Sequence, residues 1–471
     1  MKRNVAPDNI RSLLFSLDGI PPFAAALPLA LQHVVAMIVG CVTPAIIVAS
    51  AAGLSLADRV LLIQASLVAA AFGTIVQLYP IGKRTGVHVG AGLPVIIGVS
   101  FAYVPTMQAL ASEYGVAAIL GAQLCGGVCA VIVGLLIRRI RRFFPPLVAG
   151  TVVFTIGLSL YPIAINYMAG GIGSPTYGSW QNWVVAAFTL IVVTFFSHFG
   201  KGILRLASIL VGIIAGYVLA LCMGMVQFDN VASAGYFQMP QLMHFGLEFD
   251  IPAIIAISIL FTINSVQAIG DFSATTSGAM DRQPTTDELH GAIVGLGVTN
   301  MIGAFFSFLP TASFSQNVGI VTTTKVINRA TLALAAIIIL VAGLLPKFSA
   351  LLTTIPYAVL GGATVSVFAS IAMTGIKLAL SEGATSRNTA IIGLAVAMGM
   401  GLSAAPQTLH LFPAWVTMIF GKAPVVVASI IAIVLNLVLP NHELSFHQGN
   451  HADAAADTAD ADATETNTKE S

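Results

Sequence analysis

Long apolar stretches separated by short polar segments run along most of the chain. Many of them exceed about 18 largely apolar residues, the length that a helix needs to cross a bilayer. We therefore expect fourteen membrane-spanning segments, at 24–50, 57–81, 88–110, 115–137, 144–167, 181–199, 204–225, 251–272, 287–309, 311–326, 330–346, 354–376, 388–405 and 424–440. The pattern predicts an all-α polytopic membrane protein.

Two of the predicted spans are interrupted. The third opens with the Gly- and Pro-containing run 89–94, and the tenth lies in 310–325, whose first half is too polar and too broken for a continuous spanning helix. Irregular polar backbone at membrane depth is tolerated only where it is buried in protein or lines a cavity. We expect each interrupted span to be part short strand and part half-helix, with the positive amino-terminal end of the helix directed at a ligand.

The spans divide into two halves of seven, at 21–225 and 251–440. An odd number of spans inverts the second half relative to the first, and the interrupted span is the third in each. Inverted repeats place a substrate near the midplane of the membrane, between broken helices at matching positions. Outside the halves we expect a cytoplasmic amino-terminal segment at 1–20, a periplasmic loop at 226–250, and a disordered acidic cytoplasmic tail at 441–471.

The distribution of Lys and Arg supports this number and order of spans. With a cytoplasmic amino terminus, seventeen of the 20 Lys and Arg residues face inside, and only Arg59, Lys347 and Lys422 face outside. Both termini are then cytoplasmic.

Composition excludes a soluble domain. Only 8% of residues are charged, against about 25% in ordinary globular chains, and the mean hydropathy is +0.93. A net charge of +1 gives no reason to expect a nucleic-acid partner.

Uncharged amides and one carboxylate are the candidate chemistry within the spans. Gln316 and Asn317 each offer a hydrogen-bond donor and acceptor that can read the edge of a flat heterocycle. On the eighth span, Asn264, Gln267 and Asp271 fall at i, i+3 and i+7 and form one polar stripe. Asp271 is a functional candidate by its position, with a structural role equally open. Neither the cysteines nor the histidines form a set of metal ligands, so we expect no metal and no cofactor.

The tenth span carries a resemblance to a known family. Five residues within 316–325 fit the signature of the nucleobase–ascorbate transporter family, whose bacterial members include xanthine, uric acid and uracil permeases: Gln316, Asn317, Gly319, Thr324 and Lys325. The resemblance covers about residues 20–440. It implies a core domain that holds the third and tenth spans, a gate domain that contains spans five to seven and twelve to fourteen, and a homodimer.

Other segments resemble the same family. Ser100-Phe101-Ala102-Tyr103-Val104 is similar to its aromatic-bearing strand, where the Phe stacks on the base and the preceding position tunes which purine is accepted. His33 matches a histidine of the first span that the resemblance places close to the site.

Two positions depart from the family pattern. Gln267 stands where the family has a Glu that binds the base and is linked to the proton, and Leu296-Gly297 stands where purine transporters often have Asp-Gly.

We therefore expect a secondary active transporter, not an enzyme, that imports xanthine or uric acid across the bacterial inner membrane by alternating access. Gln267 and Gln316 would bind opposite edges of the ring, Phe101 would stack on it, and backbone amides of Gly319 or Ser315 would complete the site. The coupling ion would be a proton or sodium, with Asp271 and His33 as the remaining titratable groups. Supporting roles fall to Asn264, Thr324 and Lys325.

Three alternatives remain. The cargo could be uracil or another nucleobase. It could be a small anion such as sulfate or bicarbonate, with Lys325 as its counter-charge. An embedded enzyme is disfavoured, because one carboxylate and one imidazole on distant helices make a poor catalyst.

Overall fold

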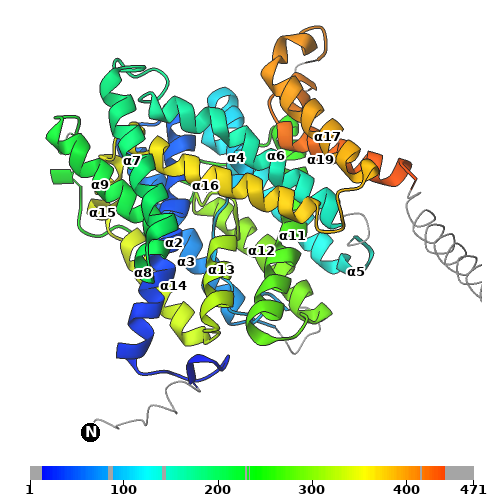
Figure 1. Ribbon diagram of the computed structural model, residues 1–471, viewed down its shortest axis with the longest axis horizontal. Coiled ribbons are helices and arrows are strands. Elements are labelled where there is room, and N and C mark those ends of the chain that lie inside the picture. The colour runs from blue at the N-terminus through cyan, green and yellow to red at the C-terminus, as the bar shows by residue number, and fades with distance from the viewer. Residues whose placement is uncertain are drawn as a thin grey trace, which may run out of the picture.

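A computed structural model describes residues 13–82, 88–140, 145–226, 228, 231–232, 234–413 and 416–440. Most of the predicted amino-terminal segment and the whole acidic tail at 441–471 lie outside these residues. The described chain is mostly helical (Figure 1).

The first half of the chain contains α2 (Phe23–Ala51), α3 (Leu56–Leu78), β1 (Ile97–Val99), α4 (Val104–Leu135), α5 (Ile137–Ile140), α6 (Pro146–Met168), α7 (Trp180–Phe199), α8 (Ile203–Leu206) and α9 (Ser208–Cys222). The second half contains α11 (Ile251–Met280), α12 (Thr286–Phe305), β2 (Thr311–Ser313), α13 (Ser315–Thr324), α14 (Arg329–Gly343), α15 (Pro346–Thr353), α16 (Tyr357–Ala379), α17 (Ser386–Ala404) and α19 (Pro424–Val438).

Local sequence explains where several of these helices begin. The Ser55 side chain accepts a hydrogen bond from the backbone of the first turn of α3, and Asn328 does the same for α14. Thr285 and Glu288 form a reciprocal capping box at the start of α12. Helix α4 is broken at Gly115, whose φ of 82° suits glycine, and this residue is the first of the predicted fourth span.

Seven described helices are long and apolar enough to cross a membrane, or eight if the bent pair α14 and α15 is one span. The angle within that pair is 79°. Two shorter apolar helices are α9 and α19. The chain is therefore a multi-pass membrane protein, while the count of fourteen spans stays a prediction.

The two interrupted spans meet as strands. β1 pairs antiparallel with β2, with Gly98 opposite Ala312 at the centre, so short strands are present where the sequence predicted them. The backbone of Phe314 continues the pairing by donating to Ile96 at 3.0 Å. A Cβ at Gly98 would lie 2.5 Å from the ring of Phe314, so glycine is needed for this close approach.

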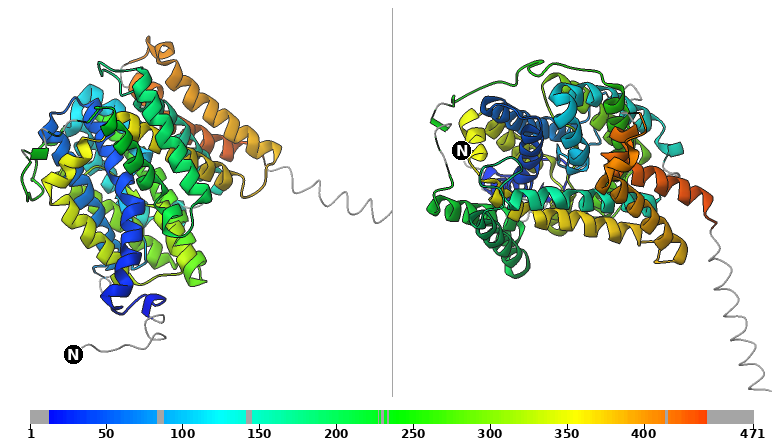
Figure 2. Two further views of the ribbon diagram at one scale, coloured as in Figure 1. Left: turned by 60° about the vertical axis from the view of Figure 1, so that its left-hand side comes forward. Right: turned by 90° about the horizontal axis from the view of Figure 1, so that it is seen from above.

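The helices pack in two groups. In one group, α4 packs on α11 and α12, α14 packs on α2 and α3, and α13 packs on α11. In the other group, α6 packs along α16, α7 packs on α9 and α16, and α19 packs on α17 and α6. Figure 2 shows α6 and α16 running side by side along one face of the molecule.

Glycines allow α6 and α16 to touch backbone to backbone. A Cβ at Gly150 would lie 2.1 Å from the backbone nitrogen of Ala379, and a Cβ at Gly375 would lie 2.1 Å from that of Phe154. Small residues at helix contacts are typical of membrane proteins, in which close van der Waals packing replaces the hydrophobic effect between helices.

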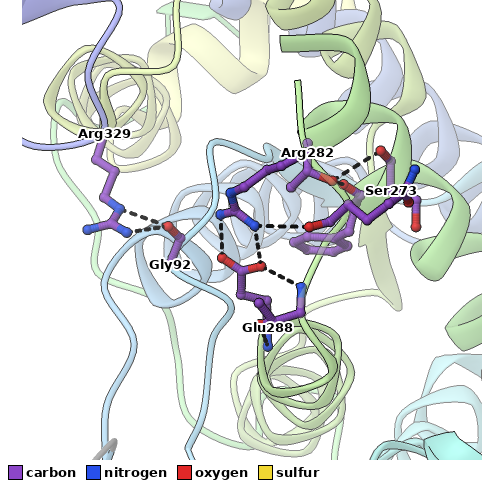
Figure 3. Close-up of polar contacts among 9 residues, drawn as sticks. Gly92, Ser273, Arg282, Glu288 and Arg329 are labelled. Atoms are coloured by element: carbon purple, nitrogen blue, oxygen red, sulfur yellow. Dashed lines mark hydrogen bonds and ion pairs between the residues drawn. The ribbon is translucent and has the colours of Figure 1, made fainter. Parts of the chain in front are cut away.

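Polar contacts fix the segment that leads into β1 and the connection between α11 and α12. Arg329, the first residue of α14, donates to the carbonyl oxygen of Gly92, just before β1 (Figure 3). Arg282, between α11 and α12, forms a bidentate pair with Glu288 at 2.8 and 2.6 Å (Figure 3). The hydrogen bond to Glu288 raises the pKa of Arg282. The pair therefore holds the connection between α11 and α12 in one geometry.

Candidate functional site

A cavity of about 610 Å³ lies where the two strands meet the two helix groups. Its walls come from the end of β1 and the residues after it, the second half of α11, the end of β2 with the start of α13, and one side each of α6 and α16. The cavity therefore lies between the group that carries the strands and the group that contains α6 and α16. Its volume suits a small molecule.

Asp271 joins three of these elements. Its carboxylate on α11 accepts a hydrogen bond from the hydroxyl of Ser313 at 2.5 Å and from that of Ser315 at 2.8 Å. Both hydroxyls belong to the interrupted tenth span, one at the end of β2 and the other at the start of α13. These bonds satisfy a buried charged group and fix the start of α13 against α11.

Two carboxamides face the cavity from different helices. Gln267 lines it from α11, one turn before Asp271, and Gln316 lines it from the first turn of α13. Within the described residues, neither side chain makes a hydrogen bond to the protein. Each can therefore offer a donor and an acceptor to a ligand.

Phe101 forms an apolar part of the wall. It lies in the short turn that follows β1, is 7% exposed and packs edge-on against Phe368 of α16, with ring centroids 5.3 Å apart. Ser100 lines the cavity beside it and caps the turn, its hydroxyl accepting from the backbone of Ala102 at 3.2 Å. The contact with Phe368 fixes the orientation of the ring that borders the cavity.

His33 and Asn317 lie behind the cavity wall and do not line it. They are 1% and 0% exposed. The amide nitrogen of Asn317 lies 3.1 Å from Nδ1 of His33 and donates to the His33 carbonyl oxygen at the same distance. The pair therefore connects α13 to α2 and supports the helix that presents Gln316.

The other candidates lie outside the cavity lining. Asn264 is buried on α11, two turns before Asp271. Gly319 is exposed on α13, with open space around its Cα. Thr324 donates to the carbonyl oxygen of Ile320 near the end of α13. Lys325 donates to the carbonyl oxygen of Gly278, so it connects the end of α13 to the end of α11.

Four hydroxyl residues of the cavity wall were not among the sequence candidates, and one of them, Ser273, lies on α11 two residues after Asp271. Ser313 lies at the end of β2, and Ser370 and Thr374 lie one turn apart on α16. Helix α16 also contains Thr364 and Ser366, so its sequence alone does not single out Ser370 and Thr374. The position of Ser313 next to Asp271 depends on tertiary packing, which spacing does not reveal.

The electrostatics of the cavity limit what it can bind. Asp271 is the only charged residue among the described residues that line it. The wall otherwise consists of apolar side chains, hydroxyls and two carboxamides. This set suits an uncharged planar molecule with polar edges better than a small anion.

Comparison with known proteins identifies the family. The family model described as "Permease family" matches residues 24–408. The xanthine permease of Bacillus subtilis is 34% identical over 418 residues, covering 88% of this chain and 94% of the relative. The uric acid permease PucK of the same organism is 35% identical over 414 residues, covering 87% and 94%.

Solved structures show a shared fold. The transmembrane domain of the cyanobacterial bicarbonate transporter BicA matches with a TM-score of 0.57 at 16% identity, covering 88% of this chain and 97% of that one. At this identity the match bears on the fold alone. Together with the permease model and the two permease relatives, the residues from Gln316 to Lys325 show that the chain belongs to the nucleobase–ascorbate transporter family, as a membrane permease and not an enzyme.

Proposed function

We propose that the protein is a secondary active transporter that imports a purine nucleobase, with xanthine and uric acid as the first candidates. The observation that carries this proposal is the pair Gln267 and Gln316, two carboxamides on separate helices of one cavity that have no hydrogen-bond partner among the described residues. The permeases for xanthine and uric acid among the relatives support it.

The cavity suggests how a base would be held. Gln267 and Gln316 bind polar edges of the ring, and Phe101 packs on its face. The Ser315 hydroxyl is engaged by Asp271, so its backbone, at the positive start of α13, is the part that can assist. Neutral hydrogen bonds each contribute about 0.5–1.5 kcal/mol net, so several together with stacking give binding that still permits release.

Helix packing supports the inverted repeat. The contacts of α4 with α11 and α12 have a counterpart in those of α14 with α2 and α3, and the pair α7 and α9 has one in α17 and α19. In this scheme the part of α4 before Gly115 corresponds to α13, and the part after it corresponds to α14. Counting the two parts of α4 as separate spans gives seven spans in each half. The group that carries the strands is the core domain, and the group that contains α6 and α16 is the gate.

Alternating access then moves the core against the gate. The cavity lies between these two groups, so relative movement would open it to one side of the membrane and then to the other. We place both termini in the cytoplasm of a bacterium and the protein in its inner membrane, from the charge distribution of the sequence. The gate would also form a homodimer.

Coupling to an ion requires a group other than Gln267, because a carboxamide does not titrate near neutral pH. Asp271 borders the cavity and contacts both halves of the tenth span through Ser313 and Ser315. We assign it the role of sensing the coupling ion, a proton or sodium. His33 affects the site through Asn317.

The small-anion alternative is less well supported. Lys325, its proposed counter-charge, bonds to Gly278 and lies 3.7 Å from Asp281, away from the cavity lining. Sulfate that competes with purine uptake would favour this alternative, and no competition would count against it.

Uptake of a radiolabelled panel in a permease-deficient bacterial strain tests the proposal. The panel contains xanthine, uric acid, guanine, hypoxanthine and uracil, each with and without a protonophore. We expect saturable uptake of an oxidised purine that the protonophore reduces. Uptake of none of the five above the empty-vector strain would contradict the proposal.

A further inference from the structure

A second cavity, of about 230 Å³, lies at the other end of α16 from the candidate site. The first cavity reaches Leu378 near the end of this helix, whereas the second is lined by Tyr357 at its start. Its walls come from the α2–α3 hairpin on one side and from Met225 and residues 353–357 on the other. It therefore lies between the core and gate groups, outside the nucleobase site.

Arg59 is the charged residue of this cavity. Its Nη1 donates to the hydroxyl of Tyr357 at 3.0 Å, and its Nε donates to the carbonyl oxygen of Leu54 at 3.0 Å. The Tyr357 hydroxyl also lies 2.6 Å from Oγ of Ser50. No carboxylate of the described residues lies within 4.0 Å of the Arg59 guanidinium.

The missing acidic partner points to an anionic ligand. Arg59 is half-buried, and a partly desolvated cation is stabilised by an opposite charge. Its Nη2 makes no hydrogen bond to a described residue, so this nitrogen is free to donate. Lys422 and Arg329 each have an acidic partner, in Glu113 and Asp18. Arg387 has no acidic partner among the described residues, but its guanidinium donates to Leu439 and Asn436 through both Nε and Nη2.

The rest of the lining fits a phosphate group attached to an apolar body. Thr353 and Thr354 add hydroxyls, and α16 begins at the cavity with no side-chain cap on its first turn. Uncapped helix starts and guanidinium groups both favour phosphate oxygens. Apolar side chains line both sides of the cavity, Ile46 and Ile63 from the α2–α3 hairpin and Met225 from the other side. They suit acyl or glycerol carbons.

We propose that this cavity binds the phosphate of a membrane lipid headgroup, with Arg59 as its cationic ligand. The same chemistry would recognise free phosphate, and the experiment below separates the two sources. Because the cavity joins the α2–α3 hairpin to the start of α16, an occupant stabilises the present arrangement of core and gate. That consequence rests on the proposed alternating access, whereas the binding site does not.

Native mass spectrometry of the purified, detergent-solubilised protein tests the site directly. The probes are dioctanoyl phosphatidylglycerol, dioctanoylglycerol, which has the same chains without the phosphate, and inorganic phosphate. We expect one saturable adduct with the phospholipid. Dioctanoylglycerol and inorganic phosphate should each bind at least about tenfold more weakly than the phospholipid, since a hydrogen bond to a charged group contributes an order of magnitude or more in affinity. Equal binding of dioctanoylglycerol, or preferential binding of inorganic phosphate, overturns the lipid assignment.

Variants locate the adduct. Arg59→Gln should weaken phospholipid binding about tenfold or more, and Arg59→Lys should keep most of it. Lys347→Gln is the matched control, because it removes one charge from a cation that lies over the ring of Tyr236 and outside the cavity lining. Unchanged binding in Arg59→Gln overturns the proposal.

A variant that retains Arg59 keeps the test valid if Arg59→Gln does not fold. Thr353→Phe places a large side chain in the cavity, and we expect it to reduce the adduct about tenfold or more by steric exclusion. Full binding in a folded Thr353→Phe protein overturns the proposal. Because these measurements do not involve nucleobase uptake, their failure is distinguishable from failure of the proposed function.

Discussion

The side-chain amide nitrogen of Asn317 lies 3.1 Å from Nδ1 of His33, with both residues fully enclosed by protein. The contact fixes one side of α13 to α2, while the hydroxyl of Ser315 fixes its first turn to Asp271 on α11. Gln316 lies between these two attachments and faces the cavity. The helix that presents Gln316 is therefore held on both sides.

The Asn317–His33 contact should be measurable as a coupling. We expect Asn317→Ala and His33→Ala each to lower the free energy of unfolding by about 1–3 kcal/mol, because each leaves a buried polar partner unsatisfied. The double variant should lose less than the sum, since the two residues share one interaction. Thermal unfolding of the purified variants tests this, with Thr323→Ala, an exposed position of the same helix, as control. Strict additivity would show that the contact is not energetically coupled.

Asp271→Asn should separate coupling from binding. The substitution keeps the size of the side chain but removes the charge that Ser313 and Ser315 stabilise. We expect concentrative uptake to fall at least about tenfold, in line with hydrogen bonds to a charged group contributing about 1.5–3 kcal/mol. Exchange of internal for external nucleobase should persist. Thr323→Ala, an exposed position outside the cavity lining, is the control. Wild-type accumulation in Asp271→Asn would remove Asp271 from the coupling step.

Gln267→Glu should make uptake depend more steeply on pH. A protonated carboxyl can donate and accept like the amide it replaces, whereas the ionised form only accepts and adds a second charge one turn from Asp271. Uptake by this variant should therefore be highest at acidic pH and fall as pH rises and the carboxyl ionises. Initial rates between pH 5 and 9 in wild type and variant measure the effect. Superimposable profiles would mean that position 267 does not contact the cargo.

Gly375→Leu should prevent stable packing of α6 on α16. Any Cβ added at this position would lie 2.1 Å from the backbone nitrogen of Phe154, so the helices would have to separate. We expect a loss of more than about 3 kcal/mol, at the upper end of overpacking effects, and little folded protein by size-exclusion fluorescence. Gly393→Leu on α17 is the matched control, because its Cβ would meet open space. Normal folding of Gly375→Leu would contradict the close contact.

Much of the fold was predictable because its signals are local. The apolar stretches predicted the helices, and the Gly- and Pro-rich run before Ile97 and the polar run after Pro310 predicted the two strands. The break in α4 at Gly115 also coincides with the start of the predicted fourth span. The angle between α14 and α15 was not predicted, because a Leu-Leu-Pro junction does not encode the direction in which the next helix packs.

The candidate site was predictable only in part. Gln267, Asp271 and Gln316 were selected from polar positions in apolar spans, and the structure brings all three to one cavity. Sequence could not show that Asn317 faces away from the cavity, because adjacent residues of a helix lie about 100° apart and the direction of α13 depends on its attachments. The hydroxyls of α16 were missed for a related reason, since they contribute from a distant part of the chain.

The central claim is that Gln316 and Gln267 bind a purine in this cavity. Equilibrium binding of radiolabelled xanthine and uric acid to the purified protein tests it most directly. Wild type is compared with Gln316→Ala and, as control, with Thr322→Ala, a half-buried position of the same helix outside the cavity lining. The account predicts that wild type binds at least one of these purines, and that Gln316→Ala weakens binding about tenfold while Thr322→Ala does not, because loss of one or two neutral hydrogen bonds corresponds to about 1.4 kcal/mol. Unchanged affinity in a folded Gln316→Ala protein would contradict it.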